Sequence, residues 1–434
     1  MPRTVRLLAS AAFTLSLLLA EGSFAESIAI RAGRLIDGLG GAPMEDVVIL
    51  VEDDRIARVG RGLEIPGDAR VIDLSDATVL PGLIDCHTHL TTSPGEASPF
   101  RRSHIDAALI APRNARATLE AGFTTVRELG APNFVDVALR NAIDRGDIPG
   151  PRIQAASMAI GATGGHSDLN GFSPFVAVDQ FDGIADGVEE IRKKVRFQVK
   201  YGADLIKVMA TAGAMSEEDS VDRALYSQEE LNAVVEEARS LGRRVAAHAH
   251  GAEGIKRAVR AGVASIDHGT FLDEEAAALM VEHGTFLVKD SYEDRWFLER
   301  APEWGYPDII IEKLEAIVAG HEAAFKLAHG RGVKIAFGTD AGVNPHGDNA
   351  RQFRDFDAWG MEPMEAILTA TRNAAELLGW EDRIGAVVPG RFADIIAVAG
   401  DPLQNMRELE NVFFVMKGGV VFKESAIGAG SNGK

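Results

Sequence analysis

A regular alternation of short apolar runs and amphipathic stretches fills residues 81–380 and constrains the fold more than any other feature. Short apolar runs between turn signals are typical of buried strands, and the stretches between them have helical periodicity. The runs lie at residues 80–84, 124–127, 152–155, 205–210, 244–248, 264–268, 285–288 and 334–337. Eight strand–helix units predict an α/β fold, a (β/α)8 TIM barrel, with an open doubly wound sheet as the alternative. No glycine-rich phosphate fingerprint follows the first strand, which favours the barrel.

Both ends of the sequence are rich in predicted strands. Residues 26–80 and 381–425 contain β-branched runs separated by turns such as Gly38-Leu-Gly-Gly41 and Lys417-Gly-Gly419. Neither segment is large enough to bury a good core alone. We therefore expect the two segments to form one small β-sandwich domain beside the barrel at 81–380.

The extreme N-terminus has the pattern of a secretory signal peptide. Arg3 and Arg6 precede an apolar run at 7–20, and Ser23-Phe24-Ala25 provides a small-x-small cleavage site. We expect residues 1–25 to be removed and the protein to be periplasmic or secreted. The glycine-rich tail at 426–434 is expected to be disordered.

Charge and cysteine content exclude several classes of protein. The formal net charge is −19, and an acidic surface repels nucleic acid and anionic membranes, so neither is expected as a partner. Cys86 is the only cysteine, which excludes an intrachain disulfide. Its place in an apolar strand predicts a buried small hydrophobe rather than a nucleophile.

Several predicted strands end in side chains that bind metal ions. The first ends in His87-Thr-His89, the fifth in His248-Ala-His250, the sixth in His268, and Asp340 follows the eighth. Residues at i and i+2 of a strand share a face, and in a barrel the carboxyl ends of the strands meet at one rim. The sequence therefore predicts a metal site, and zinc suits such nitrogen and oxygen ligands.

Lys207 is unusual because it lies inside the apolar strand Leu205-Ile-Lys-Val-Met209. A buried lysine is costly to keep charged unless it is paired with a carboxylate. That pairing is the simplest interpretation. The alternative is that Lys207 reacts with carbon dioxide and becomes an anionic carbamate, able to bridge two metal ions.

These motifs resemble those of the amidohydrolase superfamily, and the resemblance covers essentially the whole mature chain. The similar segments are Pro81-Gly-Leu-Ile-Asp-Cys-His-Thr-His89, Ile206-Lys207-Val, His248-Ala-His250-Gly, Ile266-Asp-His268-Gly, Gly338-Thr-Asp340-Ala-Gly and Val388-Pro-Gly-Arg-Phe-Ala-Asp394. The chain looks most similar to the branch that holds imidazolonepropionase-like proteins, Xaa-Pro dipeptidases and ochratoxin-hydrolysing amidases.

The resemblance implies two Zn²⁺ ions per chain, bridged by carboxylated Lys207 and a hydroxide. It assigns His87, His89 and Asp340 to the more buried ion, and His248 and His268 to the more exposed one. It also implies attack by the bridging hydroxide on an amide carbonyl, and a homo-oligomer, for which an octamer is one expectation.

Further residues are expected to shape the catalytic pocket. The resemblance makes Asp340 the general base and places His166 near the substrate or its oxyanion. His250 stands where related dipeptidases tend to have a substrate-binding tyrosine, so we assign it to substrate binding. A substrate carboxylate could pair with cationic or phenolic side chains after the seventh strand, namely Lys289, Tyr292 and Arg295.

The resemblance therefore implies a binuclear metal-dependent hydrolase of the amide bond in an N-acyl amino acid or a dipeptide. A lactonase or deaminase on the same fold, and a non-catalytic binding protein, are the alternatives. Lys207 argues against a mononuclear deaminase, and the complete ligand set argues against a binding protein.

Overall fold

The computed structural model describes residues 27–95, 103–168, 170, 173, 175, 183–215 and 220–426. The predicted signal peptide at 1–25 lies outside these residues, as does the predicted tail from residue 427 onward. None of the helices in the described ranges combines the length and apolar character that a membrane span requires.

Eight parallel strands follow one another through the middle of the chain, at the eight positions that the sequence predicts. They are β5 (Leu83–Thr88), β6 (Phe123–Glu128), β7 (Arg152–Ala155), β8 (Ile206–Met209), β9 (Val245–Gly251), β10 (Ser265–Phe271), β11 (Phe286–Lys289) and β12 (Ile335–Phe337). Every residue of β5, β6 and β9 is buried. Burial on both faces is typical of a parallel sheet covered by helices, and the predicted α/β architecture is confirmed.

The eight strands form two parallel sheets whose edges are joined. One sheet has the order β5-β6-β7 and the other β12-β11-β10-β9-β8. A parallel bridge between Ile160 and Val208 joins the two sheets beyond β7, and another between Thr88 and Ala341 joins them beyond β12. The strands therefore follow the sequence order in space, with contacts at both seams.

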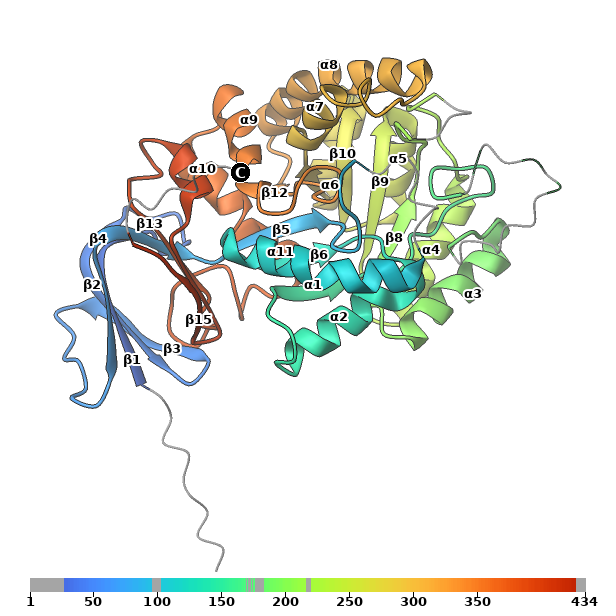
Figure 1. Cartoon of the computed structure of the whole chain (residues 1–434). Coiled ribbons are helices and arrows are strands. Elements are labelled where there is room, and N and C mark those ends of the chain that lie inside the picture. Colours follow the sequence, from blue (N-terminus) through green and yellow to red (C-terminus); the bar gives the residue numbers. More distant parts are fainter. Residues whose placement is uncertain are drawn as a thin grey trace, which may run out of the picture.

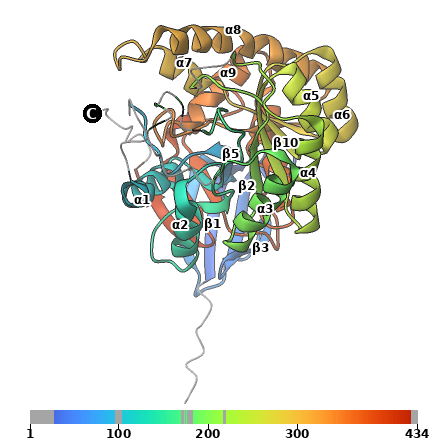
Figure 2. The same ribbon diagram turned by 90° about the vertical axis from the view of Figure 1, so that its right-hand side faces the viewer.

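Helices connect and cover these strands (Figures 1 and 2). They are α1 (His104–Glu120), α2 (Val135–Asp144), α3 (Gly187–Lys200), α4 (Gln228–Ser240), α5 (Ala252–Ala261), α6 (Glu274–His283), α7 (Tyr292–Leu298), α8 (Asp308–Arg331), α9 (Phe353–Ala358), α10 (Pro363–Thr369) and α11 (Arg372–Leu378), with 3-10 turns η2 (Pro132–Phe134), η3 (Asn349–Gln352) and η4 (Met406–Asn411). Local signals set several of these ends. Ser227 and Glu230 form a capping box at the start of α4, and left-handed Gly262 ends α5.

Strands from the two ends of the chain lie side by side in a second body (Figure 1). They are β1 (Ser27–Leu35), β2 (Met44–Glu52), β3 (Arg55–Arg61), β4 (Arg70–Pro81), β13 (Ile395–Val398), β14 (Phe414–Lys417) and β15 (Val420–Glu424). All seven form one sheet of order β15-β14-β13-β4-β1-β2-β3.

This seven-stranded sheet curls back on itself. Residues 390–393 bond to the start of β3, with the amide of Ile56 donating to the carbonyl of Arg391 at 2.9 Å. Shortly after them, β13 pairs with β4, two strands away from β2. The sequence predicts a small β-sandwich built from both chain ends, and the seven strands of those ends form one continuous sheet that is curved enough to face itself. β4 ends at Pro81 and leads directly into β5, which places the first two histidines.

Candidate metal centre

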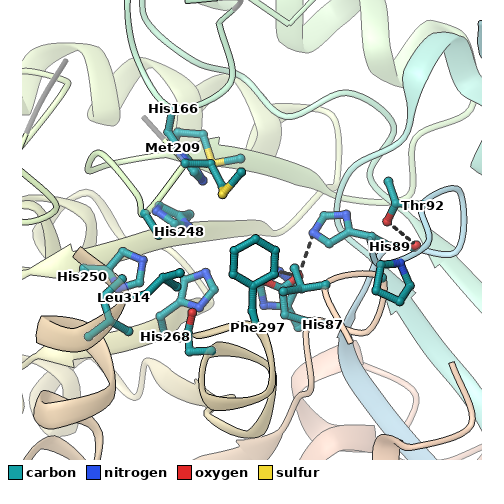
Figure 3. Close-up of a pocket in the computed structure, with 18 of the residues that line it drawn as sticks. His87, His89, Thr92, His166, Met209, His248, His250, His268, Phe297 and Leu314 are labelled. Carbon is teal, nitrogen blue, oxygen red and sulfur yellow. Dashed lines mark hydrogen bonds and ion pairs between the residues drawn. The ribbon is translucent and has the colours of Figure 1, made fainter. Parts of the chain in front are cut away.

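A cavity of about 330 Å³ lies at the carboxyl ends of the parallel strands. Its lining brings together all the residues predicted to bind metal or perform catalysis, and His250 as well: His87, His89, His166, Lys207, His248, His250, His268 and Asp340. Figure 3 shows His248, His250 and His268 grouped on one side, and His87 and His89 on the other. Strand geometry therefore explains why side chains far apart in the sequence meet here.

His87, His89 and Asp340 form the first set of possible ligands. Oδ1 of Asp340 lies 3.1 Å from Nε2 of His89 and 3.4 Å from Nε2 of His87. This oxygen is buried and makes no hydrogen bond of normal geometry to any described residue. Nδ1 of His89 lies 3.1 Å from the carbonyl of Gly130, which leaves Nε2 directed at the carboxylate.

Three atoms with lone pairs converge in this first set, so a cation must stabilise them. Burial lowers the pKa of His89, but the charge and the close approach of the Asp340 carboxylate raise it to about 9. A metal ion competes with that proton for Nε2. Because the donor set and the orphaned oxygen match a divalent cation, the residues fit the metal that the sequence predicts.

His248, His250 and His268 form the second set, with one ring nitrogen from each lying within 4.8 Å of the others. The sequence assigns the first and last of these to metal and His250 to substrate. The structure places His250 within the same group as these two, and its ring stacks on that of His268 at a centroid distance of 4.6 Å. Nδ1 of His250 lies 2.8 Å from Oγ1 of Thr270, so Nε2 is available on the other side of the ring.

Asp290 connects the two sets, and the sequence analysis did not identify it. Its Oδ2 lies 2.8 Å from Nδ1 of His87, and its Oδ1 lies 2.9 Å from Nδ1 of His268. Burial opposes ionisation, but His268 and His87 together hold the pKa of Asp290 well below its ordinary range. The carboxylate thereby fixes the tautomer of both rings and directs Nε2 of each toward the cavity.

Two more buried carboxyl groups support the first set from behind. Asp85 accepts hydrogen bonds from the amide of His87 at 3.1 Å and from Oγ1 of Thr339 at 2.6 Å, so it ties β5 to the segment before Asp340. Glu128 accepts from the amide of Leu90 at 2.8 Å. Burial raises the pKa of Asp85 to about 7 and that of Glu128 to about 8.

Lys207 is almost fully buried on β8, and its Nζ donates to Oδ2 of Asp267. Oδ1 of Asp267 accepts from Nη2 of Arg127 at 2.9 Å. The pairing with a carboxylate, the simplest interpretation of the sequence, is therefore present. Burial is the main cause that lowers the pKa of His87 and of His248, and the charge of Lys207 lowers both further. The head group of Lys207 therefore lies close to both ligand sets.

His166 packs face to face on His248, with ring centroids 4.5 Å apart. A Cβ atom at Gly213 would lie 2.3 Å from Cε1 of His166, so a glycine is required there for the ring to fit. Burial, followed by the charge of His268, lowers the pKa of His166 to about 4. His166 is therefore neutral, with both a donor and an acceptor nitrogen.

Lys289, Tyr292 and Arg295 do not belong to the described lining of the cavity, although the sequence suggests them as substrate contacts. Lys289 is fully buried behind the site, and Arg295 donates to Oδ1 of Asp355 at 2.7 Å. The hydroxyl of Tyr292 accepts from Arg351 at 2.9 Å. Protein groups therefore already pair with all three side chains, and a direct substrate contact stays a prediction from the sequence.

Cys86 is buried, and burial raises the pKa of its thiol to about 12. A thiol that stays protonated is inert, because the thiolate is the nucleophile. The interpretation of Cys86 as a packing residue is confirmed.

The amidohydrolase family pattern matches residues 78–423, so the chain belongs to the amidohydrolase family. Ochratoxinase of Aspergillus niger is 33% identical over 95% of this chain and 90% of its own length. The crystal structure of a Xaa-Pro dipeptidase with methionine bound in the active site superposes with a TM-score of 0.88, at 39% identity, covering 92% of this chain and 100% of that one. The crystal structure of A. niger ochratoxinase superposes with a TM-score of 0.81 at 32% identity, covering 93% of this chain and 97% of that one. The protein is accordingly an enzyme, a hydrolase of amide bonds.

Proposed function

We propose that the protein is a binuclear metal-dependent amidohydrolase that cleaves N-acyl amino acids or dipeptides. The observation that carries the proposal is the convergence of two ligand sets in one cavity, with one histidine of each set oriented by Asp290. The joined parallel sheets support a (β/α)8 barrel, in which active sites lie at this rim.

The chain's own residues support zinc as the metal and Lys207 as the bridge. His87, His89 and Asp340 would hold one ion, and His248 and His268 the other, with carboxylated Lys207 shared between them. Metal ions held in this way polarise a carbonyl and lower the pKa of a water molecule. A carbamate on Nζ of Lys207 would retain one N–H, which can still serve as a donor to Asp267.

Asp340 and His166 supply the proton chemistry. His87 and His89 hold the pKa of Asp340 far below its ordinary range although burial opposes this, so the carboxylate is ionised and can accept a proton from the attacking water. It can then return that proton to the leaving nitrogen. The neutral ring of His166 can donate a hydrogen bond to the oxygen that becomes negative in the transition state.

An apolar wall opposite the histidines supports a substrate with a large apolar group. Phe297 of α7 and Leu314 of α8 line it and lie in front of the histidines in Figure 3. Further apolar side chains line the same cavity: Tyr306, between these helices, Met209, the last residue of β8, and Met215, beyond that strand. Such a surface stabilises an aromatic or bulky aliphatic side chain by burial.

The test compares ochratoxin A, an aryl amide of phenylalanine, with a Xaa-Pro dipeptide, using zinc-loaded protein and kcat/KM as the readout. We expect hydrolysis of at least one amide, about two zinc ions per chain, and loss of turnover in Asp340→Asn. Preference for ochratoxin A would assign the apolar wall to the substrate's aromatic groups, and preference for the dipeptide would identify a prolidase. If metal-replete protein cleaves neither amide, the amide proposal fails, and lactone and deaminase substrates are tested next.

A further inference from the structure

A buried chain of three side chains connects the wall of the cavity to the backbone of His268. Nζ of Lys289, at the end of β11, donates to the carbonyl of His268 at 3.0 Å. The same Nζ lies 2.7 Å from Nδ1 of His321 on α8. Nε2 of His321 lies 3.0 Å from Oδ2 of Asp294, which lines the cavity.

The direction of each hydrogen bond in this chain is fixed by chemistry. A lysine ammonium has donors and no acceptor, so Nδ1 of His321 must accept from Lys289. Nε2 of the same ring then carries the hydrogen and donates to Asp294. Burial first, and the charge of Lys289 second, lower the pKa of His321, which agrees with a neutral ring in this single tautomer.

The residue at the end of this chain has an unusual backbone. His268 has a φ of 74°, in the left-handed region that residues with a Cβ rarely adopt. Such conformations persist only where the surroundings hold them, and they cluster at functional sites. Consecutive residues hold this one: Lys289 binds its carbonyl and Asp290 binds its ring.

We propose that Lys289 is a positioning residue for the metal centre, held in place by His321 and Asp294. The hydrogen-bonded series Asp294–His321–Lys289 keeps the peptide of His268 in the conformation that places its ring beside the other two members of the second ligand set. This inference rests on the proposed metal-dependent function, and it gives Lys289 a role away from the substrate.

The test measures metal content per chain after dialysis against increasing concentrations of a chelator, starting from zinc-loaded protein. We expect wild type to begin near two zinc ions. The metal content of Lys289→Met should fall to about one ion per chain at chelator concentrations roughly tenfold lower than wild type requires. Lost orientation of a ligand typically weakens metal binding by this factor or more. The metal that remains belongs to the set of His87, His89 and Asp340.

Paired variants separate positioning from general damage. Asp294→Ala removes the hydrogen-bond acceptor for His321 and should weaken binding of the same metal ion several-fold. Asp294→Asn keeps an acceptor oxygen and should leave that binding unchanged. His321→Gln, which keeps one acceptor and one donor, should retain wild-type binding, and His321→Leu should not. Lys326→Met on the exposed side of α8, where Lys326 pairs with Glu322, is the matched control.

The outcomes distinguish this inference from the proposed function. Wild type without bound metal would contradict the proposed function itself. Two metals held as tightly in Asp294→Ala and Lys289→Met as in wild type would overturn the positioning role alone. Simultaneous loss of both metals in folded Asp294→Ala would also overturn the positioning role, because the three side chains contact only the second ligand set. If Lys289→Met does not fold, Asp294→Ala against Asp294→Asn decides the question.

Discussion

At the scale of single residues, Asp290 should influence both ligand sets, because it orients one histidine from each. Asp290→Asn replaces one acceptor oxygen with an amide donor, so only one of the two Nδ1–H groups keeps its partner. We expect metal affinity to fall by about 10- to 100-fold. Chelator competition on folded protein measures the change, with Asp294→Asn as a control that retains its hydrogen bond. Unchanged affinity in Asp290→Asn would show that the rings are oriented by packing alone.

The sequence predicts the metal-binding side chains near the strand ends well, but not the carboxylate that orients two of them. His87, His89, His248 and His268 could be assigned because a strand fixes which face its side chains share. Asp290 follows directly after β11, where that alternation ends. An acidic residue at this strand end was the available signal, but only the fold shows that it reaches both rings.

At the scale of elements, α7 and α8 form the apolar wall, and only the wall side of α8 should influence substrate choice. Leu314→Ala removes a buried side chain from the cavity lining. Because burial of such a side chain contributes about 2 kcal/mol, we expect KM for a bulky aryl amide to rise by roughly tenfold or more. KM for a small N-acetyl substrate should change little. Ile309→Ala, on the exposed side of α8, is the control. Equal effects on both substrates would argue against a substrate contact.

The sequence predicts α8 but not the wall that it makes. Its periodicity at 309–330 agrees with the observed Asp308–Arg331, because length and apolar spacing set a long helix. The short helix α7, Tyr292–Leu298, has too few turns for a periodic signal. Residue type alone suggests Lys289, Tyr292 and Arg295 as substrate contacts. In the structure, the polar groups of these three side chains bond to protein partners.

At the scale of the whole molecule, Arg152 of β7 and Asp394, just before β13, join the α/β body to the curved sheet. Nε and Nη2 of Arg152 lie 3.1 and 3.2 Å from the two carboxylate oxygens of Asp394, which is 4% exposed. Arg152→Met removes the charged partner of this buried carboxylate and leaves it the hydrogen bond from the amide of Gly418 at 2.8 Å. The loss of stability should therefore stay below the roughly 3–5 kcal/mol that is typical of an uncompensated buried charge. Urea unfolding should show this loss, with partial recovery in the double variant Arg152→Met/Asp394→Asn. Equal stabilities of wild type and Arg152→Met would mean that solvent reaches Asp394.

Both chain ends were predicted to meet in one β-domain because neither could bury a core alone. The pairing of β4 with β13, and the return of residues 390–393 to β3, could not be predicted, because pairing between distant strands depends on contacts that no local pattern encodes. The same long-range pairing brings Lys417 of β14 against the loop before β7, where Nζ donates to the carbonyl of Gly150 at 2.5 Å.

Lys417 makes the junction between the two bodies sensitive to pH. Burial, and then the charge of Arg152, lower its pKa from 10.5 to about 8. Below pH 8 the folded and unfolded states both hold the proton, so the folded state bears the full cost of a buried cation, up to about 3 kcal/mol. Between pH 8 and 10.5 only the unfolded state keeps the proton, so this cost disappears and stability rises with pH.

Lys417→Met should therefore be more stable than wild type near pH 7, after a loss of about 1 kcal/mol for the hydrogen bond. The difference should shrink as pH rises through this window. Urea unfolding of both proteins at pH 7, 8, 9 and 10 tests this, and a difference that stays constant with pH would show that the pKa of Lys417 is not lowered at the junction.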